Sequence, residues 1–171
     1  MVALAEIAWH PSEENLGVYP QVASAVLDLA RTCRVSAPEH FPLALKTLGG
    51  VIHALAAHVA PGSLQALDQG TAVLVEALGM QPQGRGSLDN QAVQEAAESL
   101  GRIAALNPAW RKPLRDATGA VLSARLRACG QCESRFTKYL FWATAAISGL
   151  PAVLREMREQ HECPKVQDAA I

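Results

Sequence analysis

The chain has 171 residues, of which 50% are hydrophobic, only 5% are aromatic and 18% are charged. Its 15 basic and 16 acidic residues give a net charge of −1, without the basic excess of nucleic-acid-binding proteins, which disfavours that class. The apolar content is carried by Ala, Leu and Val, and Ala and Leu are strong helix formers. The composition therefore predicts one all-α domain over residues 1–171.

The start of the chain does not have the pattern of a signal peptide, because it lacks a basic segment and Glu6 interrupts its apolar residues. No stretch approaches the roughly 18 consecutive apolar residues that span a bilayer. The four cysteines are expected as thiols rather than disulfides. We therefore expect a soluble, cytoplasmic protein without a membrane span.

Helix-breaking residues divide the chain into three kinds of segment that recur in a fixed order. Prolines stand mostly near segment starts, and Gly17, Gly70, Gly119 and Gly149 stand where helices are expected to end. In chain order, the expected elements are an apolar helix (21–32), a long amphipathic helix (40–58), a short segment (60–70), an apolar helix (71–80), a flexible polar loop (81–90), a long helix (90–106), a short segment (107–119), an apolar helix (120–129), a long helix (133–148) and an apolar helix (150–160).

Equivalent residues of these segments recur at spacings mostly in the forties. A buried aliphatic residue late in each long helix falls at Ile7, Val51, Ile103 and Ile147, at separations of 44, 52 and 44. The Val-Leu pairs of the apolar helices begin at Val26, Val73, Val121 and Val153, at separations of 47, 48 and 32. Such periods are typical of helical-repeat solenoids, and the alternative is an ordinary helical bundle.

The stretch DNQAVQEAAESLGRIAALNPAWRKPLRDATGAVL (89–122) resembles an armadillo repeat, with a long third helix, a short first helix opening at Asn107-Pro108, and a second helix after Gly119. The resemblance implies a right-handed α-solenoid of about three to four armadillo/HEAT-like repeats. The passage from Gly149 to Pro151 lacks the short helix, which implies a local HEAT-like unit.

Both ends of the chain fall in mid-repeat under this interpretation. The apolar residues Leu4, Ile7, Val166 and Ile171 would then face water. Because solenoid ends need polar capping faces, we expect either a piece of a longer solenoid or self-association through the ends.

In armadillo proteins the third helices line a concave groove, where a Trp and an Asn of each repeat hold an extended peptide. The Trp position corresponds here to Lys46, Glu98 and Trp142, and the Asn position to Glu6, Gly50, Arg102 and Ala146. Only Trp142 matches, so binding of nuclear-import cargo is disfavoured. The expected groove instead presents Lys46, Glu98, Arg102, Lys138 and Trp142 to a partner peptide or helix.

Two of these expectations have a structural alternative. Glu98 and Arg102 stand four residues apart on one helix, so they form either a solvated ion pair or a partner contact. Trp142 is either an exposed anchor, a residue type enriched in interfaces, or a core residue packed with Phe136, Tyr139 and Phe141. Trp110 is expected in the core.

The motif Cys-Gly-Gln-Cys (129–132) suggests either redox chemistry or a metal site. A redox motif needs a βαβ context, and no strand is predicted nearby. The turns of neighbouring repeats would bring Cys129 and Cys132 near His161 and Cys163, which could supply four ligands to zinc, and free thiols are the alternative.

No phosphate loop, nucleophile elbow or carboxylate pair is visible in the sequence, so we expect neither an enzyme nor a cofactor. The sequence favours a non-catalytic scaffold for protein–protein interaction, with Trp142 as its main anchor. The alternatives are a structural subunit buried in a larger assembly and a zinc- or redox-responsive module using the CGQC turn.

Overall fold

The computed structural model describes residues 17–59, 65–81, 87–128 and 134–159, which contain seven α-helices and no strand. The helices are α2 (Tyr19–Ser36), α3 (Phe41–His58), α4 (Gln65–Leu78), α5 (Leu88–Leu106), α6 (Arg111–Ala128), α7 (Ser134–Ser148) and α8 (Leu150–Glu159). Short 3-10 helices, η2 (Pro38–His40) and η3 (Pro108–Trp110), precede α3 and α6. The all-α prediction is confirmed over this part of the chain, and none of its helices is long and apolar enough to cross a membrane.

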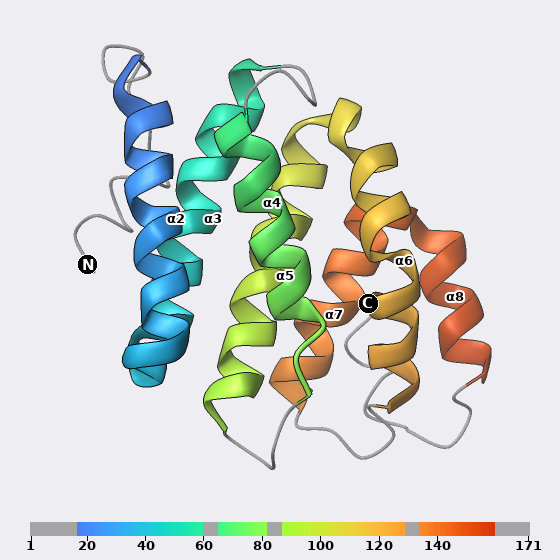
Figure 1. Ribbon diagram of the computed structural model, residues 1–171. Helices are drawn as coiled ribbons and strands as arrows, with labels where there is room; N and C mark the ends of the chain where they lie inside the picture. Colours follow the sequence, from blue (N-terminus) through green and yellow to red (C-terminus); the bar gives the residue numbers. More distant parts are fainter. Residues whose placement is uncertain (1–16, 60–64, 82–86, 129–133, 160–171) are drawn as a thin grey trace.

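The helices form two layers (Figure 1). The layer nearer the viewer, the front layer, contains α2, α4, α6 and α8, and the back layer contains α3, α5 and α7. Helix α5 packs between α3 and α7, and it also packs on α4 in the front layer. The apolar side chains of both layers meet in one continuous core, in which Leu48, Leu74, Leu100 and Leu122 are almost completely buried.

The described residues of the short segments predicted before the apolar helices, 65–70 and 107–119, do not form separate α-helices. The breaks predicted at Gly70 and Gly119 are wrong, because α4 runs through Gly70 and α6 runs through Gly119. A Cβ at position 70 would overlap Ile52 of α3, so this glycine serves the close approach of two helices. In the described residues, one continuous helix therefore stands at each of these two glycines, where a boundary between two helices was expected. The break predicted at Gly149 is confirmed, with a φ of +86° between α7 and α8.

The polar loop predicted over 81–90 ends earlier than expected. Helix α5 begins at Leu88, and the Ser87 Oγ accepts a hydrogen bond of 3.2 Å from the Asn90 N–H. A serine in this position satisfies one of the unpaired N–H groups of a helix start, which is the signal that places the boundary at Ser87. Residues 82–86 of the predicted loop lie outside the described residues.

Asn107 forms the corner between α5 and α6, as the Asn-Pro pair predicts. Its side-chain oxygen accepts a hydrogen bond of 3.1 Å from the Ala109 N–H and so caps η3. Its amide group donates a hydrogen bond to the Ala56 carbonyl near the end of α3. One side chain therefore joins this corner to the neighbouring helix of the back layer.

Small residues bring the back-layer helices close together. A Cβ at Gly49 of α3 would overlap the Oγ of Ser99 on α5 and lie 2.5 Å from its Cβ. On the opposite side of α5, a Cβ at Gly101 would lie 3.1 Å from the Ala143 Cα of α7 and would overlap the Trp142 ring. Each of the two helix contacts thus depends on a missing side chain.

Candidate partner-binding face

The exposed side of α3, α5 and α7, away from the front layer, carries all five residues predicted to contact a partner. Lys46 is exposed on α3, Arg102 is exposed on α5, and Lys138 and Trp142 are exposed on α7, while Glu98 is half-buried on α5. We call this surface the back-layer face. The helices that carry these residues are direct neighbours, so the structure places the five on one continuous surface.

Helical spacing explains why these side chains point away from the core. On α3, Gly49 faces α5 and Ile52 faces α4, so Lys46 falls on the remaining side. On α5, Ser99 faces α3 and Gly101 faces α7. The two charged residues of α5 are left on the side that no helix of the described chain covers.

Glu98 and Arg102 form the ion pair that their spacing predicts. The Arg102 Nη2 donates a hydrogen bond of 2.6 Å to the Glu98 Oε1, and the side chains are 44% and 20% exposed. Such an i,i+4 pair stabilises a helix by only about 0.2–0.5 kcal/mol. Its larger effect is to orient the Arg102 guanidinium at the centre of the back-layer face.

Trp142 is partly exposed and packs on the neighbouring helix α5. It is 39% exposed, yet its ring lies directly over Gly101, where a Cβ would be 2.8 Å from the ring atom Cε3. The contact with α5 orients the indole while one part of it stays in solvent. Trp110, in contrast, is 2% exposed, which confirms its expected place in the core.

His53 of α3 lies at the edge of this face, and burial lowers its pKa from the ordinary value of 6.5, with the charge of Arg102 as a second cause. The His53 imidazole therefore takes up its proton at a lower pH in the folded protein than in the unfolded chain. As the pH falls through about 6.5, the unfolded state gains the proton first, so the free energy of unfolding should decrease toward the lowered pKa.

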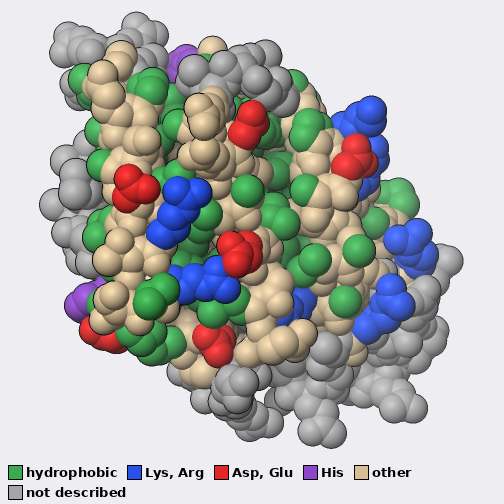
Figure 2. Space-filling view, viewed as in Figure 1, with side chains coloured by type: hydrophobic (Ala, Val, Ile, Leu, Met, Phe, Trp, Pro, Cys, Tyr) green, Lys and Arg blue, Asp and Glu red, His purple; other side chains and the backbone are tan. Residues whose placement is uncertain are grey.

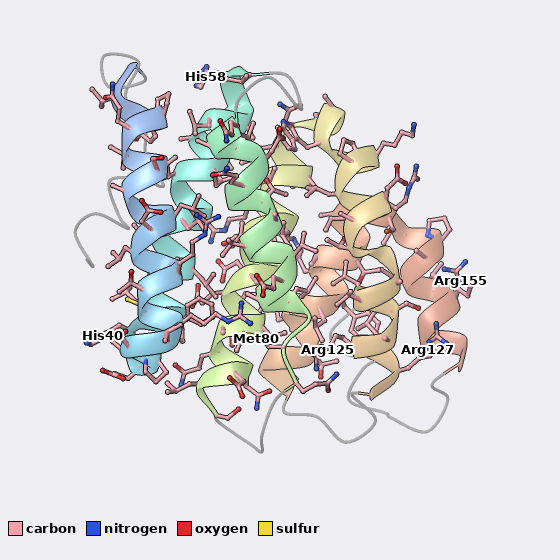
Figure 3. The ribbon with its side chains drawn as sticks, in the orientation of Figure 1. His40, His58, Met80, Arg125, Arg127 and Arg155 are labelled. Carbon is pink, nitrogen blue, oxygen red and sulfur yellow. The ribbon has the colours of Figure 1, made fainter. Side chains whose placement is uncertain are left out.

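The test compares wild type with His53→Gln in urea titrations at several pH values between about 7.5 and 5. The loss of stability on acidification should be smaller in His53→Gln. The exposed His58 of the same helix (Figure 3) provides the control His58→Gln. This variant should lose as much free energy of unfolding on acidification as wild type does. An equal loss of stability on acidification in wild type and His53→Gln would contradict the attribution of this pH dependence to His53.

The residues of the zinc and redox alternatives, Cys129, Cys132, His161 and Cys163, lie outside the described residues, as do the chain ends at Leu4, Ile7, Val166 and Ile171. Within the described part of the chain, no three His, Cys, Asp or Glu side chains gather as metal ligands. Cys33 is a buried free thiol.

A concentration of basic residues on α6 was not predicted. This helix carries five of the chain's 15 basic residues, Arg111, Lys112, Arg115, Arg125 and Arg127, and one of its 16 acidic residues. The cluster is present in the sequence, but the net charge of −1 is summed over the whole chain and does not show a local excess of basic residues. Two of the arginines serve the fold, since the Arg111 Nε donates to the Ala104 carbonyl and the Arg125 Nε donates to the Leu78 carbonyl.

Comparisons with protein-family models, with curated proteins and with solved structures give no significant match to this chain. The fold itself defines the class, which is an all-α protein of antiparallel helices stacked in two layers over the described residues.

Proposed function

We propose that this protein is a non-catalytic interaction module of the armadillo/HEAT-like α-solenoid type, which binds a peptide or helix of a partner protein on the back-layer face. The observation that carries the proposal is Trp142, which is 39% exposed and held against Gly101. Trp is enriched among the residues that dominate binding energy at protein interfaces. A tryptophan oriented before binding also loses less conformational entropy when a partner covers it.

The charges around Trp142 support the same proposal. Lys138 stands one helical turn before Trp142, and the Arg102–Glu98 pair stands on the adjacent helix. A partially exposed aromatic anchor with charged neighbours matches the arrangement of an interface core with a polar rim. Lys46 extends the basic character of this surface onto α3.

We expect Trp142→Ala to abolish capture of the partner while the protein still unfolds in one cooperative transition. The immobilised protein would capture partners from a lysate of its own source, and quantitative mass spectrometry would compare wild type with the variant. Circular dichroism and thermal unfolding would verify that the fold persists. An interface anchor of this type is typically worth about 2 kcal/mol or more, a loss of roughly thirtyfold in affinity.

A second variant, Lys138→Glu, tests the same face without touching the contact between Trp142 and Gly101. It should weaken capture of the same proteins that depend on Trp142. Val35 of α2, which is 84% exposed in the front layer, supplies the matched control Val35→Ala, which should bind as wild type does. Capture that is insensitive to both face variants, or unfolding of Trp142→Ala, would refute the proposal.

A further inference from the structure

A hollow of about 540 Å³ lies where α6, α7 and α8 meet. Its polar lining consists mainly of Arg115, Ser123 and Arg127 from α6, Ser148 from α7 and Arg155 from α8. We call this hollow the arginine trough. The α6 residues that line one wall, together with Gly119, are spaced four apart and so share one side of the helix. No Asp or Glu is among the residues that line the trough in the described chain.

The trough lies where the basic charge of the front layer is concentrated. In Figure 2, Lys and Arg side chains lie over α6 and α8 on the right of the view. Neither Arg115 nor Arg155 pairs with a carboxylate of the described residues, whereas Arg34 of α2 pairs with Glu76 of α4 in the same layer. Arg115 and Arg155 are therefore available to an anionic ligand in a way that Arg34 is not.

One wall of the trough follows the axis of α6. Arg115 and Arg127 are twelve residues apart, which corresponds to about 18 Å along the helix axis. The Arg127 Nη2 donates a hydrogen bond of 2.8 Å to the Ser123 Oγ, so its guanidinium group is turned back along α6. Figure 3 shows Arg127 and Arg155 on the side where α6 and α8 run alongside each other.

These dimensions fit an extended polypeptide. At about 3.3 Å per residue, a segment of five or six residues covers the length from Arg115 to Arg127. Alternate side chains of an extended segment point to the same side and are about 6.6 Å apart, so several carboxylates at alternate positions would face the arginine side chains of the trough together. The planar guanidinium binds a carboxylate through two parallel hydrogen bonds.

We propose that the arginine trough binds an extended acidic segment of a partner protein. The site lies on the front layer and is a second surface, distinct from the back-layer face. The described lining contains no aromatic side chain on which a nucleic acid base could stack, and it includes Ala120, Pro151 and Ala152, which suit the backbone and Cβ atoms of a peptide. These two features favour a peptide over a single-stranded nucleic acid.

The test uses the full chain and a fluorescein-labelled heptapeptide with Glu at positions one, three, five and seven and Ala between them. Fluorescence anisotropy should show binding that weakens with added salt, because the contacts are ionic. The matched peptide with Gln in place of Glu should bind about tenfold more weakly or not at all. Arg115→Glu and Arg155→Glu should each reduce affinity for the Glu peptide about tenfold or more.

The control variant is Lys112→Glu, which changes the net charge equally on the same helix but lies outside the trough. It should alter affinity less than about threefold, since only long-range attraction is lost. Trp142→Ala should leave peptide affinity unchanged, so a failure here is distinguishable from a failure of the back-layer face.

Three outcomes would overturn the proposal. They are no measurable binding of the Glu peptide, equal binding of the Glu and Gln peptides, and equal losses in Lys112→Glu and Arg115→Glu. Tighter binding of an unstructured twelve-nucleotide DNA strand than of the Glu peptide would assign the trough to nucleic acid instead.

Discussion

Gly49→Ala should lower the free energy of unfolding by about 1–3 kcal/mol, although alanine is the better helix former. The added methyl group would overlap the Oγ of Ser99 and lie 2.5 Å from its Cβ, which is fixed to the backbone of α5. The two helices would have to move apart and lose contacts along their whole length. Urea or thermal unfolding, followed by circular dichroism, measures this loss.

A second substitution, at Ser99, tests whether the overlap with this side chain causes the loss of stability. In the double variant Gly49→Ala, Ser99→Gly, both overlapping side-chain atoms are removed and the Cα of residue 99 lies at 3.6 Å, so stability should return to within about 1 kcal/mol of wild type. Ser99→Ala retains the Cβ and should not rescue Gly49→Ala. Additive losses in the double variant would show that this contact does not set the distance between the helices.

Trp110→Ala should produce the largest single loss of stability, about 3–5 kcal/mol. Trp110 is 2% exposed, ends η3 and borders a hollow of about 460 Å³ between α4 and α6. Removal of the indole would extend this hollow into the core, and the surrounding helices would collapse only partly. Chemical denaturation measures this difference when the free energy of unfolding falls with denaturant concentration at the same slope in wild type and variant.

Trp110→Phe is the informative control for this prediction. The Trp110 Nε1 is buried and has no hydrogen-bond partner among the described residues. Phenylalanine has no such donor, so the variant does not carry the cost of burying an unpaired N–H group. Trp110→Phe should therefore cost clearly less than Trp110→Ala. Equal losses in the two variants would mean that ring packing does not dominate the role of Trp110.

The helices themselves could be predicted from the sequence because their signals are local. Apolar periodicity and the Asn107-Pro108 pair predict the long helices and the corner after α5. The continuity of α4 through Gly70 could not be predicted, because this glycine has the sequence signature of a helix end unless Ile52 is known to face it. A glycine has the same local signature at a helix end and at a close contact between helices.

For the candidate sites too, the positions of residues along a helix could be predicted, but the distances between helices could not. Lys46, Arg102 and Trp142 were expected from the resemblance to armadillo repeats, and helical spacing explains why they lie on the uncovered side of their helices. The support of Trp142 by Gly101 could not be predicted, since it depends on the distance between α5 and α7. The arginine trough needs the placement of α8 beside α6, on which the sequence carries no information.

The position of α5 at the centre of the stack has a consequence for how the protein opens. Helix α5 has neighbours in both layers, whereas α2 and α8 stand at opposite ends of the front layer (Figure 1). Local unfolding begins where the fewest contacts must be broken, so among the described helices proteases and solvent deuterium should gain access to α2 and α8 before α5. Amide protons in the middle of α5 then exchange only when the whole domain unfolds, which makes this helix the most persistent part of the native state.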